Sequence, residues 1–210
     1  KFGESPGLAN IGEAEAPDKI NAIHAHLRNI AGDAHAILPR YYGIVTVAKN
    51  VQGAIPGCGG VGLSAISGAA LAGASRIIAI DIHDHKLELA KQFGATEGIN
   101  AASVDPVEAV LEMPGGGLDY SFEALGLKKT CEQAFAMLRP SGTACVIGMV
   151  PQGEKLEINA AALIDDRRLI GSNMGSNVFR IDMPRFVDFY LNGKLNLDAM
   201  ISQCVPLERI

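Results

Sequence analysis

The sequence contains no run of basic residues, because its 18 lysines and arginines are scattered among 23 aspartates and glutamates and leave a net charge of −5. That balance argues against nucleic acid or an anionic membrane surface as a partner. No apolar run approaches the ~20 residues needed to cross a bilayer, and no signal peptide is evident. The four cysteines have no paired spacing, which is typical of reduced, mostly buried thiols in a cytoplasmic protein.

The two ends of the chain indicate a fragment of a longer protein. The first residue is Lys1 rather than methionine, and the last, Ile210, lies inside an apolar stretch. Residues 1–50 are expected to form a poorly defined N-terminal tail and helix. Gly, Glu, Ala and Pro dominate its beginning, and apolar residues from Ile20 to Ile30 then recur at helical spacing.

Residues 51–210 alternate between short apolar runs and helix-like segments, and the chain is 48% hydrophobic, enough for a sizeable core. Strands are expected at 54–55, 76–80, 98–100, 118–122, 143–147 and 168–170, and helices at 60–72, 84–93, from 105 onward, 127–138 and 181–192. The strands that are apolar throughout are expected to be buried on both faces. Such strands are typical of a parallel sheet with helices above and below.

A glycine-rich hexamer, Gly57-Cys58-Gly59-Gly60-Val61-Gly62, matches the pattern G-x-G-x-x-G between the first expected strand and a helix-like segment. A second strand follows and ends at Asp81, 19 residues after Gly62, which is the context that the dinucleotide-binding fingerprint requires. Gly57 permits the tight turn, Gly59 lets a pyrophosphate approach the backbone, and Gly62 lets the helix lie close to the strand. The predicted fold is therefore an α/β domain of Rossmann type, a doubly wound parallel sheet with helices on both faces.

The hexamer and Asp81 together predict NAD as the cofactor. The start of the helix offers free N–H groups and the positive end of its dipole to the phosphates. The Asp81 carboxylate would accept hydrogen bonds from the adenosine ribose and repel a 2′-phosphate, which favours NAD over NADP. A glycine-rich turn with a surface aspartate and no cofactor is the competing interpretation. FAD also fits the hexamer, although the pattern downstream argues against it.

From residue 57 onward the sequence resembles the cofactor-binding half of the zinc-type, medium-chain alcohol dehydrogenases. The matching segments are collinear and span about three quarters of the chain: 57–62, 76–81, Lys86, 93–96, 119–126, 142–149, 167–172, 184–197 and 206–210. The resemblance implies an oxidoreductase that passes hydride between an alcohol and NAD while zinc polarises the alcohol oxygen, giving an aldehyde or ketone. It also implies a homodimer, because the family pairs the strand near 169–174 across a dimer axis.

The resemblance assigns cofactor contacts residue by residue. Asp81 and Lys86 stand where the family holds the adenosine ribose, and Leu125 stands beside the adenine. The resemblance also implies contacts with the nicotinamide. Ile147, Gly148 and Met149 stand where the family's backbone runs under the ring, and Ser172 and Met174 stand where backbone groups bind the carboxamide.

Two departures from the family are visible. Its catalytic domain is not recognisable, because the Gly-His-Glu motif and the four-cysteine structural zinc loop are absent, so zinc is implied but its ligands are not found in this chain. A catalytic zinc needs three protein ligands. The first strand also contains Pro56, and because proline avoids central strands this strand is expected to be damaged and cofactor binding weakened.

Two further hypotheses stay open. One is a non-catalytic NAD-binding fragment or remnant, and the other is a zinc-free reductase of the same superfamily, although those usually have a basic residue near position 81. His83 and His85 are candidate metal ligands, but an exposed loop over the adenosine is the favoured interpretation. Cys58 is interpreted as a structural member of the glycine loop.

Overall fold

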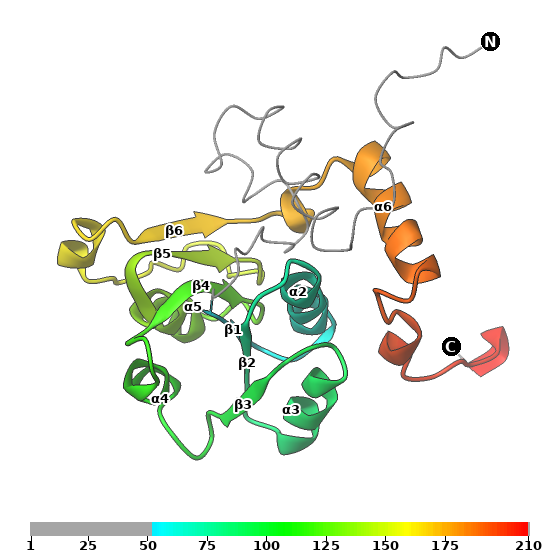
Figure 1. Ribbon diagram of the computed structural model, residues 1–210, viewed down its shortest axis with the longest axis horizontal. Coiled ribbons are helices and arrows are strands. Elements are labelled where there is room, and N and C mark those ends of the chain that lie inside the picture. Colours follow the sequence, from blue (N-terminus) through cyan, green and yellow to red (C-terminus); the bar gives the residue numbers. More distant parts are fainter. Residues whose placement is uncertain (1–51, 210) are drawn as a thin grey trace, which may run out of the picture. The chain divides into compact units, whose positions relative to one another are not determined.

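Six strands form one parallel sheet in the order β3-β2-β1-β4-β5-β6 (Figure 1). The structure is a computed structural model that describes residues 52–209. Its strands are β1 (Gln52–Pro56), β2 (Arg76–Asp81), β3 (Glu97–Asn100), β4 (Leu118–Glu123), β5 (Leu138–Val146) and β6 (Arg168–Gly171). Its helices are α2 (Gly60–Leu71), α3 (Asp84–Lys91), α4 (Pro106–Glu112), α5 (Lys128–Ala136) and α6 (Phe179–Leu191), with 3₁₀ turns η2 (Ala160–Leu163), η3 (Met174–Ser176), η4 (Asp198–Met200) and η5 (Leu207–Arg209).

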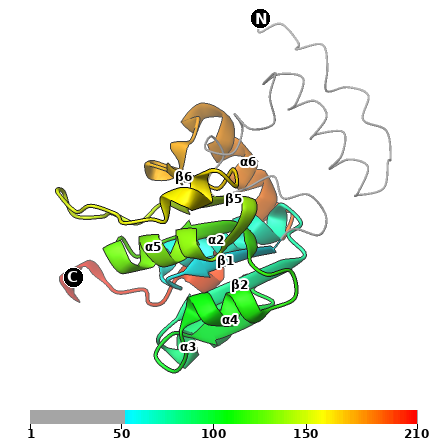
Figure 2. The ribbon, with the colours of Figure 1, turned by 90° about the vertical axis from the view of Figure 1, so that its left-hand side faces the viewer.

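The direction in which the chain crosses the sheet reverses at β1. This central strand pairs in parallel with β2 on one side and with β4 on the other. Helices α2 and α3 cover one face of the sheet, while α4 and α5 cover the other and lie in front of it in Figure 2. In such a doubly wound sheet, ligands bind outside the carboxyl ends of the strands near the reversal. The predicted α/β fold of Rossmann type is confirmed.

The central strands are buried on both faces. In β2 every residue from Ile77 to Asp81 is buried, and successive side chains of a strand point to opposite faces. On one of those faces a cluster joins Ala54 and Ile78 to Val110 of α4 and Met137 beyond α5. The apolar runs that predicted a doubly covered sheet therefore form its interior.

The expectation that Pro56 damages the first strand is wrong. β1 pairs with β2 over five residue pairs, the last of which joins Pro56 to Ile80. Proline lacks only its N–H, and at this final position its carbonyl still accepts a hydrogen bond from the Ala124 N–H at 3.1 Å. The strand can therefore end on proline inside the sheet, while the expected effect on cofactor affinity stays a prediction.

Helix α4 begins where a helix was expected, and its first turn is capped by a side chain. The Asp105 side chain accepts hydrogen bonds from the N–H groups of Val107 and Glu108 at 2.8 and 3.2 Å. Pro106 occupies the first turn, where its missing N–H costs nothing because that group would have no helical partner. Together these residues fix where α4 begins and hold the loop that precedes it.

Three of the four cysteines are buried, as their scattered positions in the sequence predicted. Cys58, Cys131 and Cys145 are buried, Cys204 is exposed, and all four are free thiols. Within residues 52–209, no helix combines the length and hydropathy that crossing a membrane requires. The predicted tail and helix within residues 1–50 lie outside the described residues.

Replacement of Asp105 by alanine should lower the free energy of unfolding by about 1 kcal/mol, because loss of an N-cap side chain leaves two helical N–H groups without an acceptor. Urea denaturation followed by circular dichroism measures this change. Glu112→Ala, at the exposed last residue of the same helix, should change stability by less than about 0.5 kcal/mol. Equal losses in the two variants would contradict the capping role.

Candidate functional site

The turn between β1 and α2 admits only glycine at two of its positions. Gly57 has a φ of +96°, and a Cβ there would lie 2.7 Å from the Leu125 Cγ atom. A Cβ at Gly62 would lie 1.6 Å from the carbonyl oxygen of Gly57, which no packing adjustment can relieve. The first turn of α2 therefore rests directly on the backbone of the loop.

The other side of the same turn is open. A Cβ at Gly59 or Gly60 would meet nothing within 4 Å, and both residues are exposed. Gly59 is the N-cap of α2 and provides no side-chain acceptor for the first N–H groups. Such N–H groups, together with the helix dipole, form a binding site for an anion such as a phosphate. Val61, at the second position of α2, is 51% exposed beside this opening.

Asp81, the last residue of β2, is only 7% exposed and anchors the glycine loop. Its Oδ2 accepts a hydrogen bond from the Cys58 N–H at 2.9 Å, and its Oδ1 accepts one from the His83 N–H at 3.1 Å. The Lys86 Nζ lies 3.8 Å from Oδ2. A carboxylate offers about four acceptor positions, so two backbone donors fix its orientation and leave capacity for a ligand.

Cys58 lies inside this loop, and its thiol stays protonated at neutral pH. Burial, followed by the negative charge of Asp81, raises the pKa of its thiol to about 12. Because the thiolate is the nucleophilic form, this side chain is almost entirely unreactive at neutral pH. The sequence-based interpretation of Cys58 as structural agrees with its surroundings.

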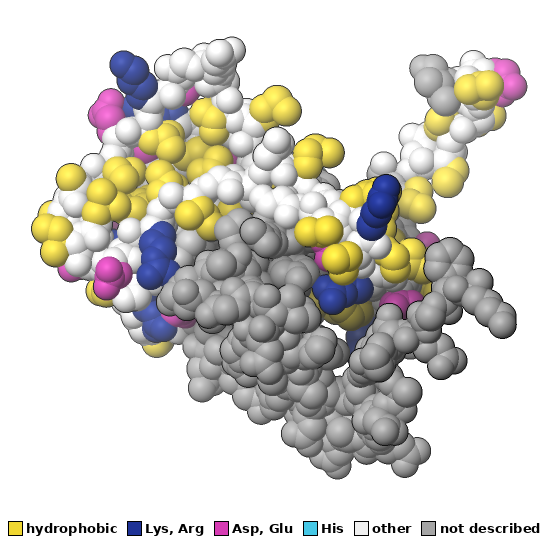
Figure 3. Space-filling view, turned by 90° about the horizontal axis from the view of Figure 1, so that it is seen from above, with side chains coloured by type: hydrophobic (Ala, Val, Ile, Leu, Met, Phe, Trp, Pro, Cys, Tyr) yellow, Lys and Arg dark blue, Asp and Glu magenta, His cyan; other side chains and the backbone are white. Residues whose placement is uncertain are grey.

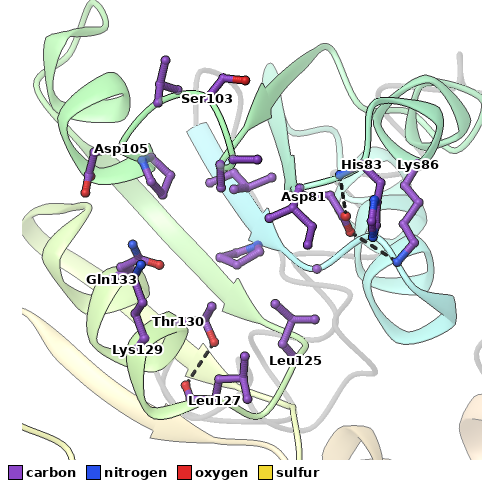
Figure 4. A pocket seen from close by; sticks show the side chains of 18 of the residues that line it. Asp81, His83, Lys86, Ser103, Asp105, Leu125, Leu127, Lys129, Thr130 and Gln133 are labelled. Atoms are coloured by element: carbon purple, nitrogen blue, oxygen red, sulfur yellow. Dashed lines mark hydrogen bonds and ion pairs between the residues drawn. The ribbon is translucent and has the colours of Figure 1, made fainter.

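A cleft of about 570 Å³ opens beside Asp81 at the carboxyl ends of the central strands (Figure 4). Four residues singled out from the sequence line it together, namely Gly57, Asp81, Lys86 and Leu125. In Figure 4, Asp81, His83 and Lys86 form one wall, and side chains of α5 form the wall opposite. The cleft therefore joins the glycine loop to a pocket large enough for a heterocyclic base.

The opposite wall was not anticipated from the sequence. It consists of polar side chains from the loop before α4 and from α5: Ser103, Asp105, Lys129, Thr130 and Gln133. Their spacing along α5 is that of an ordinary exposed helix face, so no local signal distinguishes them. Only the packing of α4 and α5 beside β4 brings these residues to the cleft.

The positions predicted to surround the nicotinamide lie outside that cleft, along the carboxyl ends of β5 and β6. Met149 and Met174 are 93% and 82% exposed. The Ser172 N–H donates to the Val146 carbonyl at 2.9 Å, which extends the pairing of β6 with β5. Their roles toward a cofactor stay predictions.

The structure adds one buried acid to the site, Glu123, which ends β4. Its side chain has no exposed surface, and its Oε1 accepts hydrogen bonds from the Leu125 and Gly126 N–H groups, each at 2.8 Å, and from the Thr130 hydroxyl at 2.7 Å. Like Asp81, it is an acid that closes a buried strand and precedes a turn. That shared pattern is the signal that could have identified it from the sequence.

The described residues do not form a zinc site. In residues 52–209, no three side chains of His, Cys, Asp or Glu are grouped so that they could hold a metal ion. His83 and His85 lie side by side with ring centroids 5.5 Å apart and are exposed. No zinc-dependent step can therefore be built from this part of the chain.

Comparison with known proteins gives the same relationship from several directions. The family model for zinc-binding dehydrogenases matches residues 60–192. The protein named "Probable S-(hydroxymethyl)glutathione dehydrogenase 1" of Schizosaccharomyces pombe is 38% identical over 175 residues, which cover 80% of this chain and 46% of the relative. This chain thus spans about half the length of the curated relatives it matches.

Two solved structures show the same likeness. An alcohol dehydrogenase zinc-binding domain protein from Burkholderia ambifaria is 35% identical with a TM-score of 0.76, over 80% of this chain and 46% of that one. A zinc-binding dehydrogenase from Sinorhizobium meliloti, bound to NADP, is 29% identical with a TM-score of 0.67, over 80% of this chain and 51% of that one. The chain therefore belongs to the zinc-binding dehydrogenase family, as its resemblance to the zinc-type alcohol dehydrogenases predicted.

Proposed function

We propose that this chain supplies the NAD-binding half of an alcohol dehydrogenase, an oxidoreductase that interconverts a small-molecule alcohol and its aldehyde or ketone. One observation carries the proposal: the glycine turn is closed on its inner side and open on its outer side, next to a buried carboxylate. Gly62 cannot hold a side chain, Gly59 and Gly60 face free space, and Asp81 lies at the edge of the adjoining cleft. These are the requirements of a dinucleotide.

In the proposed complex, the parts of NAD are bound by successive elements. Gly59 and Gly60 at the start of α2 would hold the pyrophosphate, Asp81 would bind the adenosine ribose, and the cleft beside Leu125 would take the adenine. The nicotinamide would be held by residues at the carboxyl ends of β5 and β6. Bound NAD supplies a hydride acceptor at C4 of that ring. The residues of this chain bind and orient the cofactor.

The preference for NAD over NADP rests on Asp81. Its carboxylate is held in place by the N–H groups of Cys58 and His83, so it cannot turn away from a ligand. A 2′-phosphate on the ribose would meet this negative charge at close range. The Sinorhizobium meliloti relative is bound to NADP, so we attribute the proposed preference for NAD to Asp81 and not to membership of the family.

Catalysis requires ligands for zinc that the described residues do not provide, and we therefore assign the alcohol-binding chemistry to the part of the relatives that this chain does not span. A non-catalytic NAD-binding module is the competing hypothesis. Alcohol-dependent NADH formation in the presence of zinc separates the two hypotheses. Scattered, mostly buried free cysteines support the cytoplasm as the compartment.

We also propose a homodimer joined along β6. Among residues 52–209 this strand is the last in the sheet, and the outer edge of such a strand presents backbone N–H and C=O groups that another strand can pair with. Figure 3 looks onto this side of the molecule and shows hydrophobic side chains gathered over it. Leu163 and Ile164, at and just after the end of η2 and shortly before β6, are 49% and 86% exposed.

Sedimentation equilibrium should give twice the chain mass of 22.0 kDa. Ile164→Lys should shift the chain toward monomer, because a charge in an apolar contact is costly to desolvate. Ile201→Lys, at an exposed residue of the C-terminal segment, should leave the mass unchanged. A monomeric wild-type chain at every concentration would contradict the dimer.

Replacement of Gly59 by valine should separate binding from folding. Gly59 has φ −82° and ψ −171°, which any residue adopts, and because valine is a poorer N-cap than glycine the free energy of unfolding should fall by no more than about 1 kcal/mol. The added side chain would occupy the space proposed for the pyrophosphate, and titration calorimetry should show an NAD affinity reduced by tenfold or more, equivalent to about 1.4 kcal/mol. Gly62→Ala should instead impair folding. Unchanged NAD binding in Gly59→Val would exclude the proposed cradle.

Replacement of Asp81 by asparagine keeps one acceptor oxygen for the loop but removes the charge. The affinity for NAD should fall by about tenfold, because a hydrogen bond to a charged acceptor is worth about 1.5–3 kcal/mol. The affinity for NADP relative to NAD should rise, as measured by parallel calorimetric titrations. Asp84→Asn, which makes the same change of charge at an exposed position three residues later, is the matched control. If the ratio of NADP to NAD affinity were the same in both variants, Asp81 would not be the residue that selects NAD.

A further inference from the structure

Glu123 is a buried carboxylate that pairs with no cation in the part of the chain that the structure describes. Its side chain has no exposed surface, and no lysine or arginine among residues 52–209 forms an ion pair with it. Three donors converge on Oε1, whereas Oε2 accepts no hydrogen bond from the described residues. The buried Cys131 thiol is a further neighbour, and burial, followed by the charge of Glu123, raises its pKa to about 11. A buried carboxylate satisfied on one side only is a poor way to stabilise a fold, because apolar residues of similar size often do so better. Its placement therefore points to another role.

The backbone and side chain of Glu123 hold two different loops. The carboxylate binds the N–H groups of Leu125 and Gly126 in the loop after β4. The main-chain carbonyl of the same residue accepts hydrogen bonds from Ile147 and Gly148, in the loop after β5, at 2.8 and 3.0 Å. One residue thus connects the loop that lines the cleft to the loop expected to run under the nicotinamide.

These two loops are in contact at glycine residues, so their backbones lie too close together for a side chain to fit between them. A Cβ at Gly148 would lie 2.1 Å from the Gly126 nitrogen and 2.6 Å from the Glu123 Oε2. A Cβ at Gly126 would lie 2.5 Å from the Met149 carbonyl oxygen. Because backbone meets backbone here, the separation of the loops depends on the acid beneath them and not on adaptable side chains.

We propose that Glu123 is a positioning residue for the dinucleotide. It sets the distance between the loop at 125–127, proposed to bind the adenosine, and the loop at 147–149, proposed to bind the nicotinamide. This inference rests on the proposed function. A dinucleotide spans both loops, so its two halves bind together only when the loops are correctly spaced. ADP-ribose lacks the nicotinamide, so its binding does not require the second loop to be correctly spaced from the first.

The test compares NAD with ADP-ribose by titration calorimetry on the full 210-residue chain. In Glu123→Gln the affinity for NAD should fall by about tenfold, whereas that for ADP-ribose should change by less than about threefold; tenfold corresponds to about 1.4 kcal/mol. Glu112→Gln makes the same substitution at an exposed residue of α4 and should alter neither affinity. A purely structural role would lower both affinities by the same factor together with the melting temperature.

A second pair of variants covers the case in which Glu123→Gln does not fold. Thr130→Val removes one hydroxyl donor from Oε1 and should lower the affinity for NAD more than that for ADP-ribose, by a smaller factor than Glu123→Gln. Thr130→Ser keeps the hydroxyl and should bind both ligands as the wild-type chain does. Parallel losses, unchanged NAD affinity, or a wild-type chain that binds ADP-ribose as tightly as NAD would overturn the positioning role. A wild-type chain that binds neither ligand would instead refute the proposed function.

Discussion

The contact between Gly62 and the carbonyl of Gly57 is the constraint on which the rest of the site depends. With the position of a Cβ only 1.6 Å from that oxygen, the helix and the loop meet backbone to backbone. This contact fixes how α2 leaves β1, and α2 in turn packs on β1, β2 and β4. The direction of the helix start, and hence of its free N–H groups, follows from the absence of one methyl group.

Two buried acids at the ends of two strands accept hydrogen bonds in the same way from the backbone of the turn that follows. Asp81 closes β2 and Glu123 closes β4, and each accepts hydrogen bonds from N–H groups of the following turn. Backbone N–H groups in such turns have no partner in the sheet, and leaving them buried without an acceptor is costly. A carboxylate satisfies several of them at once and fixes the loop. The acids therefore shape the rim of the cleft while they complete the fold beneath it.

The parts predictable from the sequence are those encoded by neighbouring residues. The hexamer at 57–62, the run ending in Asp81 and the start of a helix near residue 105 are local patterns, and all three appear where expected. The polar wall formed by Lys129 and Gln133 could not be foreseen, because it depends on how α5 packs across the sheet. The prediction that Pro56 damages β1 was wrong because the rule against proline in central strands does not apply to the last residue of a strand, which is where Pro56 lies.

The hydrogen bonds of Asp81 link cofactor choice to the integrity of the loop. The same carboxylate that would exclude a 2′-phosphate also anchors the N–H groups of Cys58 and His83. Redesign of the chain for the phosphorylated cofactor must therefore provide a substitute acceptor for two main-chain amides besides a cationic partner for the phosphate. A glycine or alanine introduced at position 81 alone would loosen the turn that any dinucleotide needs, whichever phosphorylation state it has.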